Sequence, residues 1–155
     1  MKIEYLSDHV AHVPTVAAWQ QAQFGYLTPA MNLDQRTERL RRSLQKDALP
    51  MALIALEDGE TPAGSAGILT ATITLAHLTP WLSSVYVPEN FRGQGIASAL
   101  SVRAVAEAAR LGFEQMYLFT PHSESLYARL GWKTFARTAH NGLPITLMQR
   151  DTGTL

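Results

Sequence analysis

Residues 85–100 of this chain read VYVPENFRGQGIASAL, and this stretch decides the fold. Val85–Val87 has the β-branched and aromatic residues typical of a strand, and from Ile96 onward the apolar residues recur at helical spacing. Between them, Arg92–Gly95 contains two glycines, which permit a tight turn and a close approach to a ligand. A strand that turns into a helix in this way directs free N–H groups and the positive end of the helix dipole at one point. The stretch therefore predicts a site for an anion such as a phosphate or pyrophosphate.

Two familiar nucleotide motifs do not fit this turn. No Gly-Lys-Ser/Thr follows the glycines, as it does in the phosphate loop of nucleotide hydrolases. The third glycine and the later acidic residue of the dinucleotide fingerprint are also missing. The anion site predicted here must therefore belong to another class.

The stretch resembles the acyl-CoA signature of the GNAT superfamily of N-acetyltransferases. In that superfamily a valine-rich strand is followed by Arg/Gln-x-x-Gly-x-Gly/Ala, which corresponds here to Arg92-x-x-Gly95-x-Ala97. A second block, SLYARLGW at residues 125–132, is similar to the superfamily's Tyr-x-x-Leu-Gly-Phe/Trp segment. The two motifs occur in the expected order, and the resemblance extends over essentially the whole chain.

The bulk composition favours a globular protein without disulfides. A chain of 155 residues suits a single domain, 1–155, with a sizeable core. The formal net charge is zero, which argues against a nucleic-acid partner, and the absence of cysteine excludes a cysteine nucleophile. No apolar run is long enough for a membrane helix, so we expect a cytoplasmic protein without a membrane partner, either a monomer or a homodimer.

Periodicity and turn signals along the chain predict the order β-α-α-β-β-β-α-β-α-β-β. The predicted elements outside the opening stretch are a strand at 2–6, helices starting at 9 and near 32–34, strands at 50–57, 63–75 and 115–119, a helix from 121 to 130, and strands at 132–138 and 144–149. The chain is therefore expected to have an α/β fold.

The resemblance implies more about that fold. A GNAT fold has a mixed, mostly antiparallel sheet flanked by helices, with strands four and five splayed apart. The pantetheine arm of acetyl-CoA lies along strand four in the gap, as an added strand would. Carried onto this chain, the backbone of Val85, Tyr86 and Val87 binds the arm. The pyrophosphate would be held by the amides of Arg92, Gly93, Gln94, Gly95, Ile96, Ala97 and Ser98. We expect no metal, since the histidines lack ligand spacing.

The implied reaction moves an acetyl group from acetyl-CoA to an amine of a small molecule or peptide by direct attack. A lysine-like amine is neutral in only about one molecule per 10³ at pH 7, so deprotonation costs roughly 4–5 kcal/mol. In the family motif the tyrosine protonates the departing thiolate, which makes Tyr127 the candidate general acid. The alternative is that Tyr127 is a core aromatic beside Leu126 and Leu130.

The general base is left open. Many relatives carry a glutamate on or near strand four, but residues 81–87 contain no acid. His77, His122, Glu124 or a water chain could accept the proton. Thr120 also stands where many relatives have an asparagine. The missing glutamate supports a second hypothesis, a non-catalytic acyl-CoA sensor or partner module.

Three features bear on the acceptor. Residues 25–32 correspond to the segment that shapes acceptor choice in the superfamily, and Tyr26 and Met31 suggest an apolar lining. Trp81 and Tyr86 could wall the acceptor pocket or belong to the core. Basic residues are concentrated on the second predicted helix, at Arg36, Arg39, Arg41, Arg42 and Lys46. A solvated face, partly neutralised by nearby acids, is the favoured interpretation of that helix. The alternatives are a nearby acidic acceptor or CoA phosphate, and an acidic protein partner.

Overall fold

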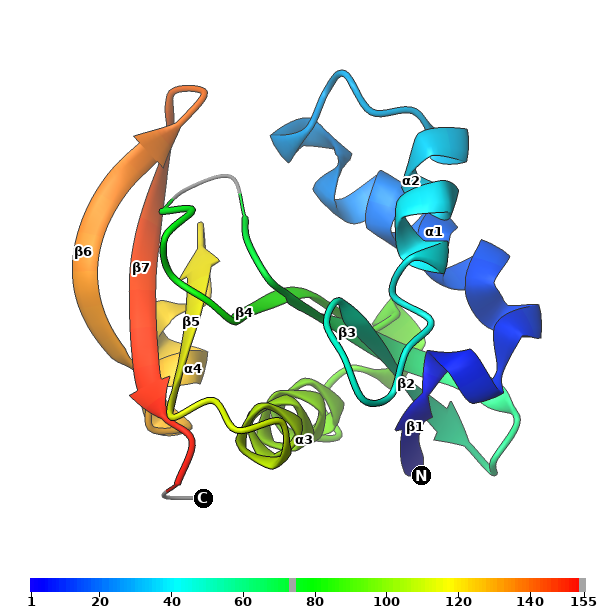
Figure 1. Ribbon diagram of the computed structural model, residues 1–155. Coiled ribbons are helices and arrows are strands. Elements are labelled where there is room, and N and C mark those ends of the chain that lie inside the picture. The colour runs from blue at the N-terminus through cyan, green and yellow to red at the C-terminus, as the bar shows by residue number, and fades with distance from the viewer. Residues whose placement is uncertain (73–74, 154–155) are drawn as a thin grey trace.

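The structure, a computed structural model, describes residues 1–72 and 75–153. One sheet runs through it in the order β1-β2-β3-β4-β5-β7-β6 (Figure 1). The strands are β1 Lys2–Tyr5, β2 Met51–Glu57, β3 Thr61–Leu69, β4 Trp81–Tyr86, β5 Gln115–Thr120, β6 Lys133–His140 and β7 Leu143–Asp151. The helices are α1 Val13–Phe24, α2 Leu33–Arg41, α3 Ile96–Arg110 and α4 Glu124–Arg129. The predicted order of elements and the mixed, mostly antiparallel sheet are confirmed.

Three predicted boundaries are wrong. The helix predicted from residue 9 begins at Val13, after two short 3₁₀ turns at Leu6–Asp8 and Val10–His12. The strand predicted at 63–75 ends at Leu69, and residues 73–74 lie outside the described part of the chain. The helix predicted from 121 begins at Glu124. It starts later because the Thr120 hydroxyl accepts hydrogen bonds from the N–H groups of His122 (3.3 Å) and Ser123 (2.9 Å), which closes a turn first.

The sheet separates two hydrophobic cores, one under each pair of helices (Figure 1). Successive residues of β2 point to opposite faces, so Leu53 packs in the core of α3 and Ile54 in the core of α1 and α2. Leu100 anchors the first core, and Leu40 belongs to the second. This packing fixes α3 against the sheet, and the glycine turn connects β4 to the start of that helix.

Strands β4 and β5 run parallel and pair at a single register position, Trp81 with Tyr117. The other edge of β5 pairs with β7 along its whole length, Gln115–Thr120. Beyond Trp81 the two strands diverge, which confirms the expected splay (Figure 1). Within the described residues, the edge of β4 that faces β5 is therefore left without a strand partner after Trp81.

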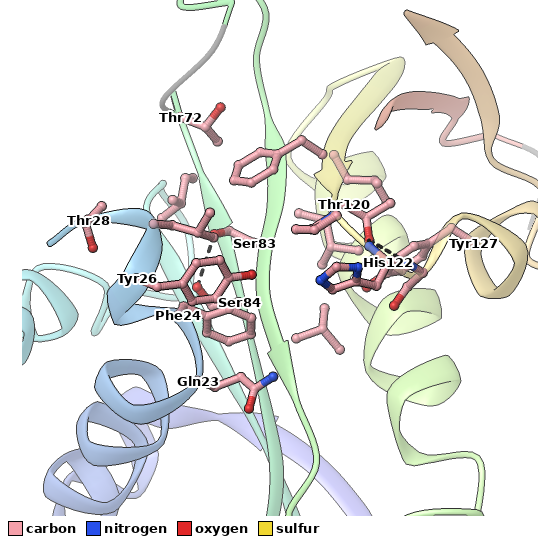
Figure 2. Close-up of a pocket in the computed structure, with 18 of the residues that line it drawn as sticks. Gln23, Phe24, Tyr26, Thr28, Thr72, Ser83, Ser84, Thr120, His122 and Tyr127 are labelled. Atoms are coloured by element: carbon pink, nitrogen blue, oxygen red, sulfur yellow. Dashed lines mark hydrogen bonds between the residues drawn. The ribbon is translucent and has the colours of Figure 1, made fainter. Parts of the chain in front are cut away.

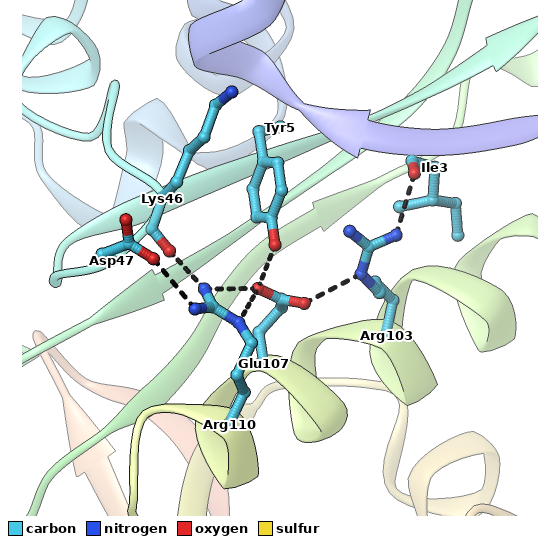
Figure 3. Close-up of polar contacts among 7 residues, drawn as sticks. All are labelled: Ile3, Tyr5, Lys46, Asp47, Arg103, Glu107 and Arg110. Atoms are coloured by element: carbon cyan, nitrogen blue, oxygen red, sulfur yellow. Dashed lines mark hydrogen bonds and ion pairs between the residues drawn. The ribbon is translucent and has the colours of Figure 1, made fainter.

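A buried carboxylate ties α3 to the start of the chain (Figure 3). Glu107 accepts hydrogen bonds from the Tyr5 hydroxyl (2.6 Å), from Arg103 (3.1 Å) and from Arg110 (2.9 Å). Arg110 also pairs with Asp47 at 3.0 Å, in the segment between α2 and β2. Because Glu107 is only 6% exposed, this network holds α3 against β1 with little competition from water.

Candidate active site

A cleft opens where β4 and β5 diverge. Its empty volume is about 1050 Å³, including the open mouth. Its walls come from residues within 23–28, from 82–85 on β4, and from 118–123 on β5 and the following turn. Figure 2 shows Phe24 and Tyr26 on one side, with His122 and Tyr127 facing them across β4. The splayed strands and the segment after α1 thus enclose a space large enough for a small acceptor.

Strand β4 is kinked at this cleft. Ser84 has a φ of 55°, in the left-handed region that non-glycine residues rarely adopt. The β3–β4 register shifts here, from Ser65 opposite Tyr86 to Gly67 opposite Ser83, so Ser84 and Val85 have no register partner on β3. The bulge therefore lies in the part of β4 that lines the cleft.

The glycine turn leads directly into α3. Gly93 and Gly95 both have φ near 80°, and a Cβ added at either would meet nothing within 4 Å. The first helical hydrogen bond runs from the Ala99 N–H to the Gly95 carbonyl (3.0 Å), so the N–H groups of residues 96–98 precede the helical ladder. Among the residues that the structure describes, no side chain caps this end of α3. The turn therefore leaves N–H donors and open space at the positive end of the helix dipole.

Tyr127, on α4, lines the cleft and is 8% exposed. Its ring packs edge-on against Trp132, with ring centroids 6.2 Å apart. Burial raises the pKa of Tyr127 to about 12, although a hydrogen bond with Ser101 acts in the opposite direction. The phenol therefore keeps its proton at neutral and moderately alkaline pH.

The three side chains considered as a base lie in different surroundings. His122 is exposed and lines the cleft. The Glu124 carboxylate accepts hydrogen bonds from Arg137 (2.8 Å) and from the Thr134 hydroxyl, and these hold the pKa of Glu124 below its ordinary value. His77 is exposed in the connection between β3 and β4 and does not line the cleft.

The residues predicted to shape the acceptor pocket lie in different parts of the structure. Trp81 is fully buried and donates from Nε1 to the Leu78 carbonyl at 2.6 Å, so it belongs to the core. Tyr86 packs against Trp19 with centroids 5.3 Å apart and does not line the cleft. Tyr26 does line it and is 53% exposed, whereas Met31 faces a second hollow that includes His140.

The prediction of a solvated basic helix is wrong for two of its residues. Arg36 is 5% exposed, and Arg36 and Arg39 both line the cleft. Arg36 lies four positions before the buried Leu40 and so shares its face of α2, a spacing that could have revealed it. Leu33, the first residue of α2, is by contrast 46% exposed.

The remaining basic residues of this segment agree with the prediction. Arg41 and Arg42 are exposed, and Lys46 forms an ion pair with Asp8 at 2.6 Å. The position of Arg36 and Arg39 in the cleft was missed because it depends on how α1 and the segment after it pack against α2, which is tertiary structure.

Residues 13–132 match the family model of the acetyltransferase (GNAT) family. Among solved structures, an aminoglycoside 6'-N-acetyltransferase in complex with coenzyme A superposes with a TM-score of 0.77 at 14% identity, covering 98% of this chain and 97% of that one. The aminoglycoside 6'-N-acetyltransferase from Enterococcus faecium gives 0.75 at 15% identity, with coverage of 98% and 97%. A ribosomal-protein-alanine N-acetyltransferase from Brucella melitensis gives 0.75 at 18% identity, with coverage of 97% and 99%.

No curated protein sequence is significantly similar to this chain. Across residues 1–72 and 75–153, no helix is both long and apolar enough to cross a bilayer. The same residues contain no cluster of His, Cys, Asp and Glu with the geometry of a metal site.

Proposed function

This chain belongs to the GNAT family of acetyltransferases, and we propose that residues 1–155 form one domain that transfers the acetyl group of acetyl-CoA to an amine by direct attack. Bound acetyl-CoA supplies the reactive thioester. The observation that carries the proposal is the opening between β4 and β5: among the described residues, the edge of β4 that faces β5 has no strand partner after Trp81, and the buried phenol of Tyr127 lines the cleft there. The glycine turn and the start of α3 follow β4 directly along the chain.

The cofactor cradle is assigned to backbone groups. The pantetheine arm pairs with Val85 and Tyr86 at the end of β4 and with Val87 just after it, along an edge that pairs with β5 only at Trp81 within the described part of the chain. The pyrophosphate binds the amides of residues 92–98, and the free N–H groups at the start of α3 support this assignment. One of the solved relatives contains coenzyme A, which agrees with this use of the fold.

The carbonyl of the thioester needs a donor in the transition state. The N–H of Ser84 or Val85 is assigned that role, because neither residue has a register partner on β3 and both line the cleft. The kink at Ser84 would then serve catalysis, since strain is retained where the surroundings enforce it.

Two protons move in the reaction. The acceptor nitrogen bonds to the acetyl carbon, the carbon–sulfur bond breaks, and Tyr127 donates its hydroxyl proton to the departing sulfur. His122 is assigned the proton that leaves the amine, since among the three side chains considered it alone lines the cleft. The tyrosinate then recovers a proton from solvent and the protonated His122 releases one to solvent, which closes the cycle without a covalent intermediate.

The proposal is tested by combining calorimetry with an assay of thiol release. CoA should bind, and acetyl-CoA should be consumed with at least one amine of a broad panel. If CoA binds but no amine on the panel is acetylated, the chain is a non-catalytic acyl-CoA module instead. If neither CoA nor acetyl-CoA binds, the assignment of the glycine turn to the pyrophosphate is wrong.

A further inference from the structure

The cleft carries an unbalanced positive charge. Among the described residues that line it there are two arginines, Arg36 and Arg39, and no aspartate or glutamate. Both arginines also line a small adjoining cavity that they share with Ser83 and Ser84 on the kinked strand. Their side chains therefore lie between α2 and the part of β4 that borders the cleft.

Arg36 is held rigidly by neutral groups. Its Nη2 donates to the Thr28 hydroxyl at 2.6 Å and its Nε to the Gln21 side-chain oxygen at 3.2 Å. Gln21 is fixed in turn, because its amide donates to the Met31 carbonyl at 3.0 Å. These bonds fix the orientation of the guanidinium, but they leave its positive charge in place because both acceptors are uncharged.

Arg39 has no hydrogen bond or ion pair from its side chain to any described residue. Other arginines do have acidic partners: Arg103 and Arg110 pair with Glu107, and Arg137 pairs with Glu124. Burial lowers the pKa of both Arg36 and Arg39, and the next cause is the positive charge of Arg39 on Arg36 and of Arg42 on Arg39. A half-buried guanidinium without a counter-ion is costly unless a ligand provides one.

We propose, building on the proposed acetyltransferase function, that the acceptor is an amine that also carries an anionic group, which Arg39 binds directly while Arg36 supplies a second positive charge behind it. A guanidinium recognises carboxylate and phosphate with the same fork of donors, so either group would serve. A polycation such as an aminoglycoside or a polyamine would meet like charge in this cleft and is disfavoured.

The test measures acetyl-CoA consumption with paired acceptors that differ in one anionic group. Glutamate is compared with glutamine, aspartate with asparagine, phosphoethanolamine with ethanolamine, and an acidic with a neutral peptide N-terminus. Kanamycin and spermidine represent polycations. We expect kcat/KM to be about tenfold or more higher for the anionic member of at least one pair, and that pair identifies the source of the anion.

The role of Arg39 is tested by comparing it with a matched variant on the same helix, α2. Arg39→Gln should remove the preference, mainly through KM, whereas Arg41→Gln alters an exposed arginine and should retain it. The affinity for CoA, measured by calorimetry, should be unchanged in both variants.

Failure of this inference differs from failure of the proposed function. Turnover that favours neutral or polycationic acceptors, or a loss of CoA affinity in Arg39→Gln, overturns the anionic acceptor and leaves the acetyltransferase in place. CoA binding without turnover on any acceptor overturns the function and the inference together.

Discussion

The Nε of Arg92 donates a hydrogen bond to the carbonyl of Val87 at 2.9 Å. The first residue of the glycine turn is thereby tied back to the chain just after β4. The guanidinium also lies over the ring of Tyr86, 5.9 Å from its centroid. These two contacts hold a positive charge beside the open N-terminus of α3, where a diphosphate would benefit from it.

Replacing Arg92 should weaken the binding of CoA. We expect Arg92→Ala to raise the Kd for CoA about tenfold, the lower end of the 1.5–3 kcal/mol typical of a hydrogen bond to a charged group. The salt dependence of binding should also decrease, because one exposed cation is lost. Calorimetry at two ionic strengths measures both effects, and an unchanged Kd would show that Arg92 does not contact the carrier.

A second prediction concerns Gly95. Its φ of 80° costs an alanine about 1–2 kcal/mol of folding stability, and the new methyl would project into the open space before α3. We expect Gly95→Ala to lower the free energy of unfolding by about that amount and to weaken CoA binding tenfold or more. Denaturant unfolding and calorimetry measure the two quantities separately.

Gly112 provides the matched control, because it follows the other end of α3. Its φ is 92°, and an added Cβ there also meets nothing within 4 Å. Gly112→Ala should therefore have a similar stability cost and leave the Kd for CoA unchanged. An equal loss of CoA affinity in both variants would mean that backbone strain, not contact with the ligand, weakens binding.

A third prediction follows from Tyr127. Tyr127→Phe keeps the ring that packs against Trp132 and removes only the acidic proton. If the phenol is the general acid, kcat should fall by about 10²-fold or more while the Kd for CoA is unchanged. Unchanged turnover would leave Tyr127 with only its role in the core.

The raised pKa of Tyr127 also determines the pH profile. Because that pKa is about 12, the phenol stays protonated well above pH 9. The rate should therefore rise with pH as the acceptor amine loses its proton, with no descending limb from Tyr127 below about pH 11. A fall in kcat centred near pH 10 would contradict the burial of this phenol.

The sequence revealed the order of elements and both motif regions because these depend on local patterns. Val85–Leu100 combines strand residues, turn glycines and helical spacing within one window. The kink at Ser84 could not be predicted, since serine has no preference for positive φ and the bulge depends on the pairing of β4 with β3. The cationic cleft was missed for a related reason: the residues that bury Arg36 come from α1 and the segment after it.

A fourth prediction tests the buried carboxylate that anchors α3. Glu107→Gln removes the charged partner of Arg103 and leaves Arg110 paired only with Asp47, so it should lower the free energy of unfolding by about 2 kcal/mol at pH 7. Glu114→Gln, an exposed change near the end of the same helix, should alter it by no more than about 0.5 kcal/mol. Similar losses in the two variants would show that the network adds nothing to stability.

The effect of Glu107 depends on pH with a definite sign. Burial alone would raise the pKa of Glu107, but the hydrogen bonds from Tyr5, Arg110 and Arg103 outweigh it and place that pKa below the ordinary value. Its stabilising contribution is therefore complete above about pH 4.3, the usual pKa of a free glutamate, and is lost as the pH falls through the lower folded value. The wild type and Glu107→Gln should converge in stability as the pH falls below 4.

A fifth prediction connects packing to the cofactor cradle through Gly64. A Cβ added there would lie 3.0 Å from Ile96 Cγ2, 3.1 Å from Leu100 Cδ1 and 3.1 Å from the Tyr86 carbonyl oxygen. The carbonyl cannot move without disturbing β4, so relief must come from α3, whose first residue is Ile96. Gly64→Ala should therefore cost about 1–3 kcal/mol of stability and also weaken CoA binding, because the N–H donors of α3 shift. Gly67→Ala is the control on the same strand, since its nearest contact is 3.5 Å from the Ser83 carbonyl. If Gly64→Ala destabilises the protein but binds CoA as the wild type does, the position of α3 is not what sets the affinity.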